Sequence, residues 1–178
     1  AKWIDGVHEL VDRQGYVETM FGRKRRFIGH PKVAEKFHKV EAQIVKILGR
    51  KPKNIWDEEL PYELKQQYWK VAGEYFKTSR QSVNAIIQGT AADIMKKALV
   101  NLYNLFEEWG EDYKILATIH DEVLMEVPEN VTLEQIEQIE STMKNCVKLY
   151  LPLKVDVELM YRWGEGISKK EFFKGEEK

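Results

Sequence analysis

The sequence YKILATIHDEVLMEVP, residues 113–128, contains two apolar runs separated by the polar step His120-Asp121-Glu122. The runs are rich in aliphatic residues, and Pro128 ends the second of them. Short apolar runs bounded by polar or proline breaks are typical of β-strands. Because the step between them is so short, the two strands must fold back on each other. The stretch therefore predicts a hairpin, residues 113–128, with carboxylates at its turn.

A long helix is predicted immediately before the hairpin. Apolar residues recur at helical spacing throughout residues 78–110. Thr78 or Ser79 can cap its first turn, and Gly110 can end it. This helix is the largest element that the sequence predicts.

Residues 131–161, after the hairpin, predict a helix and a last strand. Thr132 and Gln135 form a capping-box signature at the start of an amphipathic segment. The strand is predicted from LKVDVELMY, in which apolar and polar residues alternate. Residues 162–178 are a polar tail, in which Phe172 and Phe173 predict a short docking turn.

The N-terminal part of the chain predicts further helices and one extended element. Apolar spacing indicates a helix at residues 1–14, and alternation broken by glycine indicates a basic strand-turn at residues 15–28. Residues 29–77 predict one helix at 32–48 and another that begins near Pro61. The order of elements predicts an α+β fold, in which helices pack on one face of a small antiparallel sheet.

Length and composition predict one compact, soluble domain. The chain has 178 residues, of which 43% are hydrophobic, enough to bury a core. Cys146 is the single cysteine, and no apolar run approaches the roughly 18 residues of a membrane span, so a reducing compartment is expected. The N-terminus shows no signal-peptide pattern. It starts within a helical pattern, which suggests a piece of a longer protein.

The charges are distributed unevenly, although the formal net charge is −1. Residues 23–54 carry eleven Lys or Arg and two Asp or Glu, whereas residues 107–140 carry one Lys and eleven Asp or Glu. The basic stretch favours a polyanion, and carboxylates around a turn can hold divalent cations. Two solvated faces would explain the same asymmetry.

Asp121 and Glu122 are candidate catalytic and metal-binding residues. They lie between two apolar strands, which would hold them rigidly at a sheet end. Mg²⁺ prefers carboxylate oxygens and needs only one or two from the protein when phosphates supply other ligands. In two-metal phosphoryl transfer, two ions about 3.5–4 Å apart activate the attacking hydroxyl and stabilise the leaving oxygen. Asp121 could bridge such a pair, but an ordinary acidic turn is the alternative interpretation.

Arg80, Asn84 and Gln88 are candidate DNA-binding residues. Their spacing of four residues places these hydrogen-bond donors in a stripe along one helix face. Every base pair offers acceptors in the minor groove, so the stripe could inspect duplex geometry without reading sequence. A polar solvent-exposed face is the alternative interpretation.

Further candidate DNA contacts lie in two other segments. The run Arg23-Lys24-Arg25-Arg26 follows Gly22, which allows close backbone approach, and suits contacts to phosphates. His120 could donate to a primer end or a sugar, or only satisfy its own turn.

Three segments of the chain, in their order, resemble the end of family A DNA polymerases, the DNA polymerase I type. They are GYVETMFGRKRRF, RQSVNAIIQGTAADIMKKALVNL and ILATIHDEVLMEVP. The most specific parts are QGTAAD at residues 88–93 and HDE at residues 120–122. The resemblance implies the C-terminal half of a polymerase palm, interrupted by an inserted helical segment at residues 29–77. It implies template-directed 5′–3′ nucleotidyl transfer in DNA replication.

The resemblance also implies roles for individual residues. Asp121 corresponds to the motif C aspartate that ligands both catalytic metals, and Glu122 to its acidic neighbour near the primer terminus. The helix that contacts template and primer through the minor groove corresponds to the one bearing Arg80, Asn84 and Gln88. The basic strand-turn that contacts the duplex corresponds to GRKR, residues 22–25.

Two features depart from the family. Residues 29–77 are far longer than the link usual in the cellular enzymes, and their surplus of lysines predicts an additional duplex contact. In the tail, Trp163 precedes the glycine pair, whereas the family tends to place a tryptophan after it. The resemblance therefore gives no position for the tail.

The family's other palm aspartate and its triphosphate-binding fingers residues precede the point where this sequence starts. Phosphoryl transfer needs a full cage of charge around the phosphates, so we expect no polymerase activity from this chain alone. The expected partners are primer-template DNA, a dNTP, two Mg²⁺ ions and a second polypeptide that carries the missing motifs, fingers and thumb. The expected location is the cytoplasm of a bacterial or phage-infected cell, or another reducing compartment that contains DNA.

Two other functions fit parts of the sequence. An accessory module could retain the duplex-binding surface of a palm without catalysis. A self-contained metal-dependent nuclease would need more clustered carboxylates and histidines than the HDE step supplies. Substitution of Asp121 distinguishes the accessory module from a catalytic subunit, because only the catalytic subunit should lose function.

Overall fold

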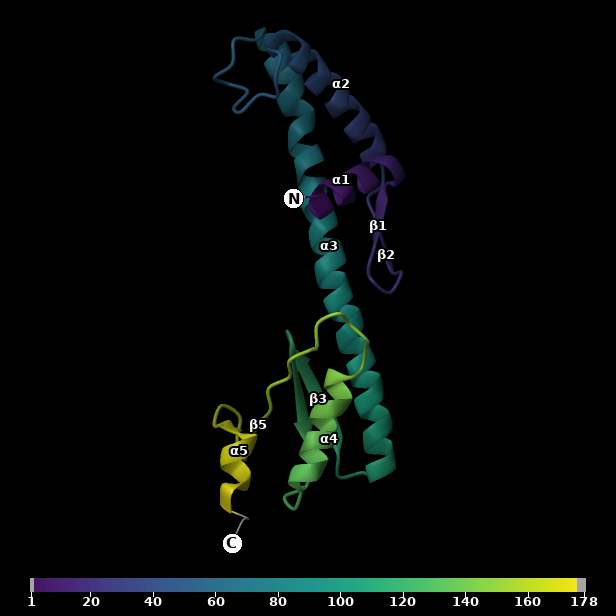
Figure 1. Cartoon of the computed structure of the whole chain (residues 1–178), viewed down its shortest axis with the longest axis vertical. Coiled ribbons are helices and arrows are strands. Elements are labelled where there is room, and N and C mark those ends of the chain that lie inside the picture. The colour runs from purple at the N-terminus through teal and green to yellow at the C-terminus, as the bar shows by residue number, and fades with distance from the viewer. Residues whose placement is uncertain (1, 176–178) are drawn as a thin grey trace. The chain divides into compact units, whose positions relative to one another are not determined.

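The computed structural model describes residues 2–175, and the chain divides into two units, Ala1–Ala91 and Ala92–Lys178. Figure 1 shows the elements of both. The fold is α+β, as the sequence predicts, but the strands of the described residues form three separate two-stranded antiparallel sheets and not one small sheet. Within residues 2–175, no helix combines the length and the hydropathy needed to cross a bilayer.

The first unit contains three helices and one short hairpin. They are α1 (Lys2–Gln14), β1 (Tyr16–Glu18), β2 (Lys24–Arg26), α2 (His30–Leu48) and the first part of α3 (Tyr62–Trp109). β1 and β2 pair antiparallel, from Tyr16↔Arg26 to Glu18↔Lys24. The helix expected at 1–14 and the basic strand-turn at 15–28 are thus confirmed over the described residues.

Two glycines and a proline mark the ends of α2. Gly29 precedes the helix with φ of 83°, and Pro31 occupies its first turn, where a missing N–H costs nothing. Gly49 ends it in the left-handed conformation, with φ of 71°, and its N–H donates to the Val45 carbonyl. The expected helix at 32–48 is confirmed within two residues.

The apolar faces of α2 and of α3 pack together in the first unit. Phe37 stacks on Tyr75 with ring centroids 4.0 Å apart, and Ala34 and Ala72 are buried beside them. A neighbouring cluster is formed by Ile44, Ile55 and Leu64. A third cluster joins α1 to the hairpin and to α3 through Val7, Val11, Val17 and Phe27.

Asp12 of α1 joins three helices of this unit through its carboxylate. His30 Nε2 lies 2.8 Å from Asp12 Oδ1, and His38 Nε2 lies 2.8 Å from Asp12 Oδ2. The Tyr75 hydroxyl donates to Oδ2 at 3.0 Å. Burial, together with the Asp12 charge, raises the pKa of Tyr75, so the phenol stays protonated and keeps donating. We call these four residues the Asp12 cluster.

The predicted helix start at Thr78 or Ser79 is wrong, because α3 runs without a break from Tyr62 to Trp109. The Ser79 hydroxyl does not cap a helix start. It donates back to the Tyr75 carbonyl at 2.9 Å, and the Ser82 hydroxyl donates to the Ser79 carbonyl at 2.8 Å. Buried serines can make such bonds inside a helix. The division between a helical insertion at 29–77 and a separate helix at 78–110 is therefore not a break in structure.

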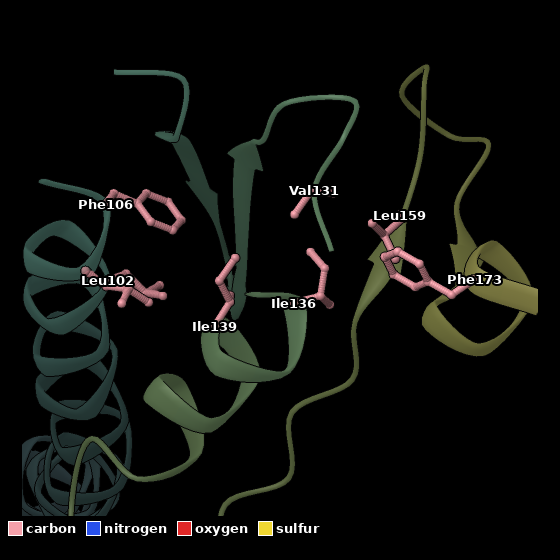
Figure 2. Packing of buried hydrophobic residues seen from close by; sticks show 8 residues of the cluster. Leu102, Phe106, Val131, Ile136, Ile139, Leu159 and Phe173 are labelled. Atoms are coloured by element: carbon pink, nitrogen blue, oxygen red, sulfur yellow. The ribbon is translucent and has the colours of Figure 1, made fainter. Parts of the chain in front are cut away.

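The second unit contains the rest of α3 and the remaining elements of the chain. They are β3 (Lys114–Ile119), β4 (Glu122–Glu126), α4 (Leu133–Lys144), β5 (Glu158–Leu159), β6 (Ile167–Ser168), α5 (Lys169–Phe172) and η1 (Phe173–Gly175). Figure 2 shows their shared core, in which Leu102 and Phe106 of α3, Ile136 and Ile139 of α4, and Leu159 and Phe173 are buried.

The capping box of α4 is present as predicted, because Thr132 and Gln135 exchange side-chain and backbone hydrogen bonds. The expected strand over LKVDVELMY is mostly wrong, since only Glu158 and Leu159 form one. They pair with Ser168 and Ile167 of β6, and no other described strand pairs with residues 153–157. Alternation alone does not make a strand without a partner for its backbone.

The tail docks through Phe173 and a lysine. Phe173 is buried in the core shown in Figure 2, whereas Trp163 is exposed. Lys169 and Lys144 both form ion pairs with Glu140 of α4, and these two hydrogen-bonded ammonium groups lower the pKa of Glu140. The docking turn expected at Phe172 and Phe173 is thus present, and residues 176–178 of the tail lie outside the described residues.

Candidate functional site

His120 and Asp121 form the two-residue turn of the β3–β4 hairpin. The strands pair from Lys114↔Glu126 to Ile119↔Glu122, with a register irregularity between Ile115 and Ala117. His120 has φ of 57°, and no other non-glycine residue among 2–175 has a positive φ. A positive φ at the first turn position belongs to tight hairpin turns that usually use glycine. A histidine there stores strain of about 1–3 kcal/mol, which the flanking strands must enforce.

The strands beside this turn are anchored in the core of the second unit. Ile115, Val123 and Met125 pack against the buried cluster of Leu102, Phe106 and Ile139. The step at the tip has the opposite environment, because His120, Asp121 and Glu122 are all exposed. The hairpin therefore presents its carboxylates to solvent from a fixed support.

The carboxylates at the tip fit a hard cation in their chemistry. Neither Asp121 nor Glu122 has a hydrogen-bond or ion-pair partner within residues 2–175, so their oxygens are available. Asp121 lies in the turn, whereas Glu122 is the first residue of β4. Among the described residues, no group of three or more His, Cys, Asp or Glu side chains is placed to hold a metal ion. One or two carboxylates suffice for Mg²⁺ only when phosphates or water supply the other ligands.

Arg80, Asn84 and Gln88 lie on α3 at successive four-residue intervals, as the sequence predicts. All three side chains are exposed, and none has a partner within the described part of the chain. Their donors are therefore available to an external row of acceptors. The stripe belongs to the first unit, in which the α1, α2 and hairpin contacts support α3.

The basic turn between β1 and β2 is attached to α3 next to this stripe. Arg23 Nη2 donates to the Gly89 carbonyl at 2.8 Å, and the Met20 N–H donates to Thr90 Oγ1 at 3.0 Å. Gly89 permits this approach, because a Cβ there would lie 2.7 Å from Thr19 Cγ2 and 3.2 Å from Arg23 Nη2. The structure thus brings Arg23 beside Gln88.

The four basic residues of the turn have different environments. Arg23 donates a hydrogen bond to the Gly89 carbonyl. Lys24 forms an ion pair with Glu18 at 3.4 Å and lies over the Tyr16 ring, 4.6 Å from its centroid. Arg25 lies over Phe27, and Arg26 is exposed. The side chains of Arg25 and Arg26 consequently have no hydrogen-bond or ion-pair partner within the described residues, whereas Arg23 positions the turn.

Sequence reasoning assigned no role to Gly89, Thr90 or Thr19. Thr19 organises the turn, since its hydroxyl accepts from the Phe21 and Arg23 N–H groups at 3.3 and 3.2 Å. Thr90 receives the Met20 N–H. The QGTAAD segment contained the signal, because an interior helix glycine implies a close backbone approach. The approaching segment, however, is about 70 residues away in sequence and cannot be read from local pattern.

Replacing Gly89 by alanine should destabilise the first unit by about 1 kcal/mol. The helix gains about 1 kcal/mol of propensity, but overpacking against the fixed Thr19 costs about 1–3 kcal/mol. Gly73→Ala is the matched control, because Gly73 lies on α3 and a methyl group there would meet no described atom within 4 Å. That variant should be stabilised. Thermal unfolding of both variants measures the difference, and equal shifts would contradict the packing role of Gly89.

Comparison with known proteins places the chain among polymerases. The family model for DNA polymerase family A matches residues 1–165. DNA polymerase I of Chloroflexus aurantiacus is 29% identical over 165 residues, which cover 92% of this chain and 14% of that protein. The thermostable DNA polymerase I of Thermus thermophilus is 30% identical over 161 residues, which cover 90% of this chain and 15% of that protein.

Two further proteins match in part. DNA polymerase theta of Drosophila melanogaster is 36% identical over 96 residues, 50% of this chain and 5% of that protein. A solved structure of the POL domain of Pol1 from M. smegmatis, in complex with DNA primer-template and dNTP, aligns with a TM-score of 0.55 and 24% identity. It covers 86% of this chain and 20% of the solved chain, and it shows a shared fold. The chain spans only 14–15% of the length of the two bacterial relatives. Since the family model covers residues 1–165 of 178, the chain belongs to DNA polymerase family A.

Proposed function

We propose that this chain supplies part of the active site of a template-directed DNA polymerase that adds nucleotides in the 5′–3′ direction. The observation that carries the proposal is the position of Asp121. It lies at the exposed tip of an anchored hairpin, inside the region matched by the family model. A carboxylate that is rigid, solvent-accessible and unpaired within residues 2–175 suits a metal-dependent phosphoryl transfer.

Asp121 is the proposed ligand of two Mg²⁺ ions, with Glu122 as a neighbouring carboxylate. Mg²⁺ bound there would activate the primer hydroxyl and stabilise charge on the triphosphate. The anchored strands keep Asp121 at one position, so little reorganisation is needed when the substrate arrives. His120 is proposed to donate to the primer terminus, because its ring is exposed beside Asp121.

The DNA contacts are proposed to come from the first unit. Arg80, Asn84 and Gln88 can donate to the acceptors that every base pair presents in the minor groove. Arg25 and Arg26 are exposed and can neutralise phosphates, with Arg23 and Lys24 beside them. This division of labour would hold the duplex in register without selecting a sequence.

The remaining catalytic parts are proposed to lie outside these 178 residues. The bacterial relatives are about seven times as long as the aligned region, so most of each relative has no counterpart here. Fingers, thumb and the other palm aspartate would come from a second polypeptide or from a longer chain that contains this sequence. Primer-template DNA and a dNTP are the proposed substrates.

The purified 178-residue chain should show no primer extension with Mg²⁺ and all four dNTPs, because a single carboxylate cannot form the full charge cage. The native polypeptide or complex that contains this sequence should extend the same primer. Gel analysis of a labelled primer measures both reactions. Extension by the isolated chain would contradict the proposed division of the active site, and a native complex without any extension would favour the non-catalytic duplex-binding module.

A further inference from the structure

Arg80, Asn84 and Gln88 form the Arg80 stripe, and α3 carries three exposed aromatic side chains before this stripe begins. Tyr62, Trp69 and Phe76 are 66%, 46% and 41% exposed and are spaced by seven residues. An α-helix turns by about 100° per residue, so all three lie within about 40° of the direction in which Arg80 points. Because α3 is continuous, these aromatics and the polar stripe share one side of a single helix. We call Tyr62, Trp69 and Phe76 the aromatic strip.

Two rings of the strip contact other aromatic rings, and all three stay partly exposed. Trp56 stacks on Trp69 with centroids 6.2 Å apart and an interplanar angle of 16°. Lys65 Nζ donates to the Trp56 carbonyl at 3.0 Å and so fixes the loop that carries this ring. Phe76 contacts Phe37 edge to face, with centroids 5.2 Å apart. Rings held in this way offer large flat surfaces at little entropic cost.

Around α3 itself, the lysines lie nearer to the strip than the glutamates do. Lys70 and Lys77 are exposed and lie about 60–80° around α3 from Arg80, whereas Glu63 and Glu74 lie further around the helix, at about 100–120°. In the adjoining loop, Glu58 pairs with Arg50 at 2.8 Å, and Asp57 accepts from Asn54 at 2.7 Å. The open side of the helix therefore combines flat rings with ammonium groups along its border.

We propose that the aromatic strip binds single-stranded nucleic acid, as the continuation of the strand that leaves the duplex at the Arg80 stripe. Aromatic faces interleaved with cations are the usual means of binding unpaired bases without sequence preference. Bases would stack on Trp69 and Phe76, while Lys70 and Lys77 contact phosphates. The direction of the strand rests on the proposed function, but the stacking itself does not. Residues 56–77 would then bind unpaired bases in addition to any contact with the duplex.

Binding of a labelled 20-nucleotide oligothymidylate to the 178-residue chain tests the proposal. Trp69→Ala should weaken this binding about tenfold, since stacking contributes on the order of 1–3 kcal/mol per base. Trp69→Phe should retain it within about twofold. Trp163→Ala is the matched control, because Trp163 is a 66% exposed tryptophan of the second unit. Tyr62→Ala removes a 66% exposed ring of the same strip. It tests the strip a second time in case Trp69→Ala disturbs folding.

A blunt duplex, measured in parallel, separates this inference from the proposed function. Arg80→Ala should weaken duplex binding and leave oligothymidylate binding nearly unchanged, while Trp69→Ala should do the reverse. If Arg80→Ala behaves as expected and both Trp69→Ala and Tyr62→Ala leave oligothymidylate binding unchanged, the strip is not a nucleic-acid site and the polymerase proposal stands. If Trp69→Ala instead abolishes self-association in sedimentation without affecting oligothymidylate, a second copy of the chain is the occupant and the inference is wrong.

Discussion

Replacing Asp121 by alanine in the complete polymerase should lower the rate of primer extension at least about a thousandfold. Asp121 is the carboxylate proposed to bridge both metal ions. Among the described residues, no group of three or more His, Cys, Asp or Glu side chains is placed to hold the ions in its absence. Loss of a preorganised group that stabilises transition-state charge typically costs about 10²–10³ in rate, and a shared metal ligand should cost more. Binding of the primer-template should change by less than about twofold, because the proposed duplex contacts lie in the first unit.

Single-turnover extension with saturating dNTP measures this effect without interference from product release. Asp121→Asn tests the charge in nearly the same shape and should be almost as slow. Asp112→Ala is the matched control, since Asp112 is an exposed aspartate at the opposite end of the hairpin. Glu122→Gln should cost less, about tenfold, because only one of the two carboxylates is proposed to bridge the ions. An Asp121→Ala enzyme that extends primers within about tenfold of the wild-type rate would favour the accessory-module function.

The elements that sequence predicted well are those set by local signals. The β3–β4 hairpin follows from two apolar runs and a polar step, α2 from its apolar repeat and the Gly49 that ends it, and the start of α4 from the Thr132 capping box. Each signal lies within a few residues of the element that it defines. Such signals act on the backbone directly and survive in most tertiary contexts.

The errors arose where a local pattern had two structural outcomes. Ser79 was interpreted as a helix cap, but a serine can equally donate to a carbonyl one turn earlier when its surroundings are buried. The alternation at LKVDVELMY predicted a strand, but a strand needs a partner, and only Glu158 and Leu159 have one among the described residues. In both cases the residue types alone do not decide which of the two structures forms.

Long-range contacts account for what sequence could not predict in the site. The approach of the basic turn to Gly89 joins residues 23 and 89, and no local pattern links them. The exposed stripe of Arg80, Asn84 and Gln88 was predictable, because its residues share one helix. Its continuation into the aromatic strip was not, because it depended on α3 having no break at Ser79.

Replacing Asp12 by alanine should destabilise the first unit by about 3 kcal/mol. The Asp12 carboxylate accepts hydrogen bonds from His38 and from the Tyr75 hydroxyl, and it also pairs with Nε2 of His30. The His30 residue is only 3% exposed. His30 Nδ1 is already a buried atom without a partner among the described residues. Removing Asp12 would leave both ring nitrogens of His30 unpaired, and the Tyr75 hydroxyl would lose its acceptor in apolar surroundings. Buried polar groups that lose their partner cost about 1–3 kcal/mol each.

Urea unfolding of the 178-residue chain measures this loss, and limited proteolysis between α1 and α2 locates it in the first unit. Asp5→Ala, at an exposed position of the same helix, is the control and should change stability by less than about 0.5 kcal/mol. His38→Ala should be mild, because its side chain is 49% exposed and water can replace it. Tyr75→Phe removes one donor and should fall between the two.

The Asp12 cluster also determines how the stripe is presented, which makes this prediction a test of the site as well as of stability. Asp12 lies on α1, His30 and His38 on α2, and Tyr75 on α3, one turn before Ser79 and Arg80. If the cluster orients α3, Asp12→Ala should weaken duplex binding at temperatures where the chain is still folded, whereas Asp121→Ala should not. If Asp12→Ala unfolds at a lower urea concentration but binds duplex as tightly as the wild type, the stripe is held by apolar packing alone, and the Asp12 cluster has no part in DNA binding.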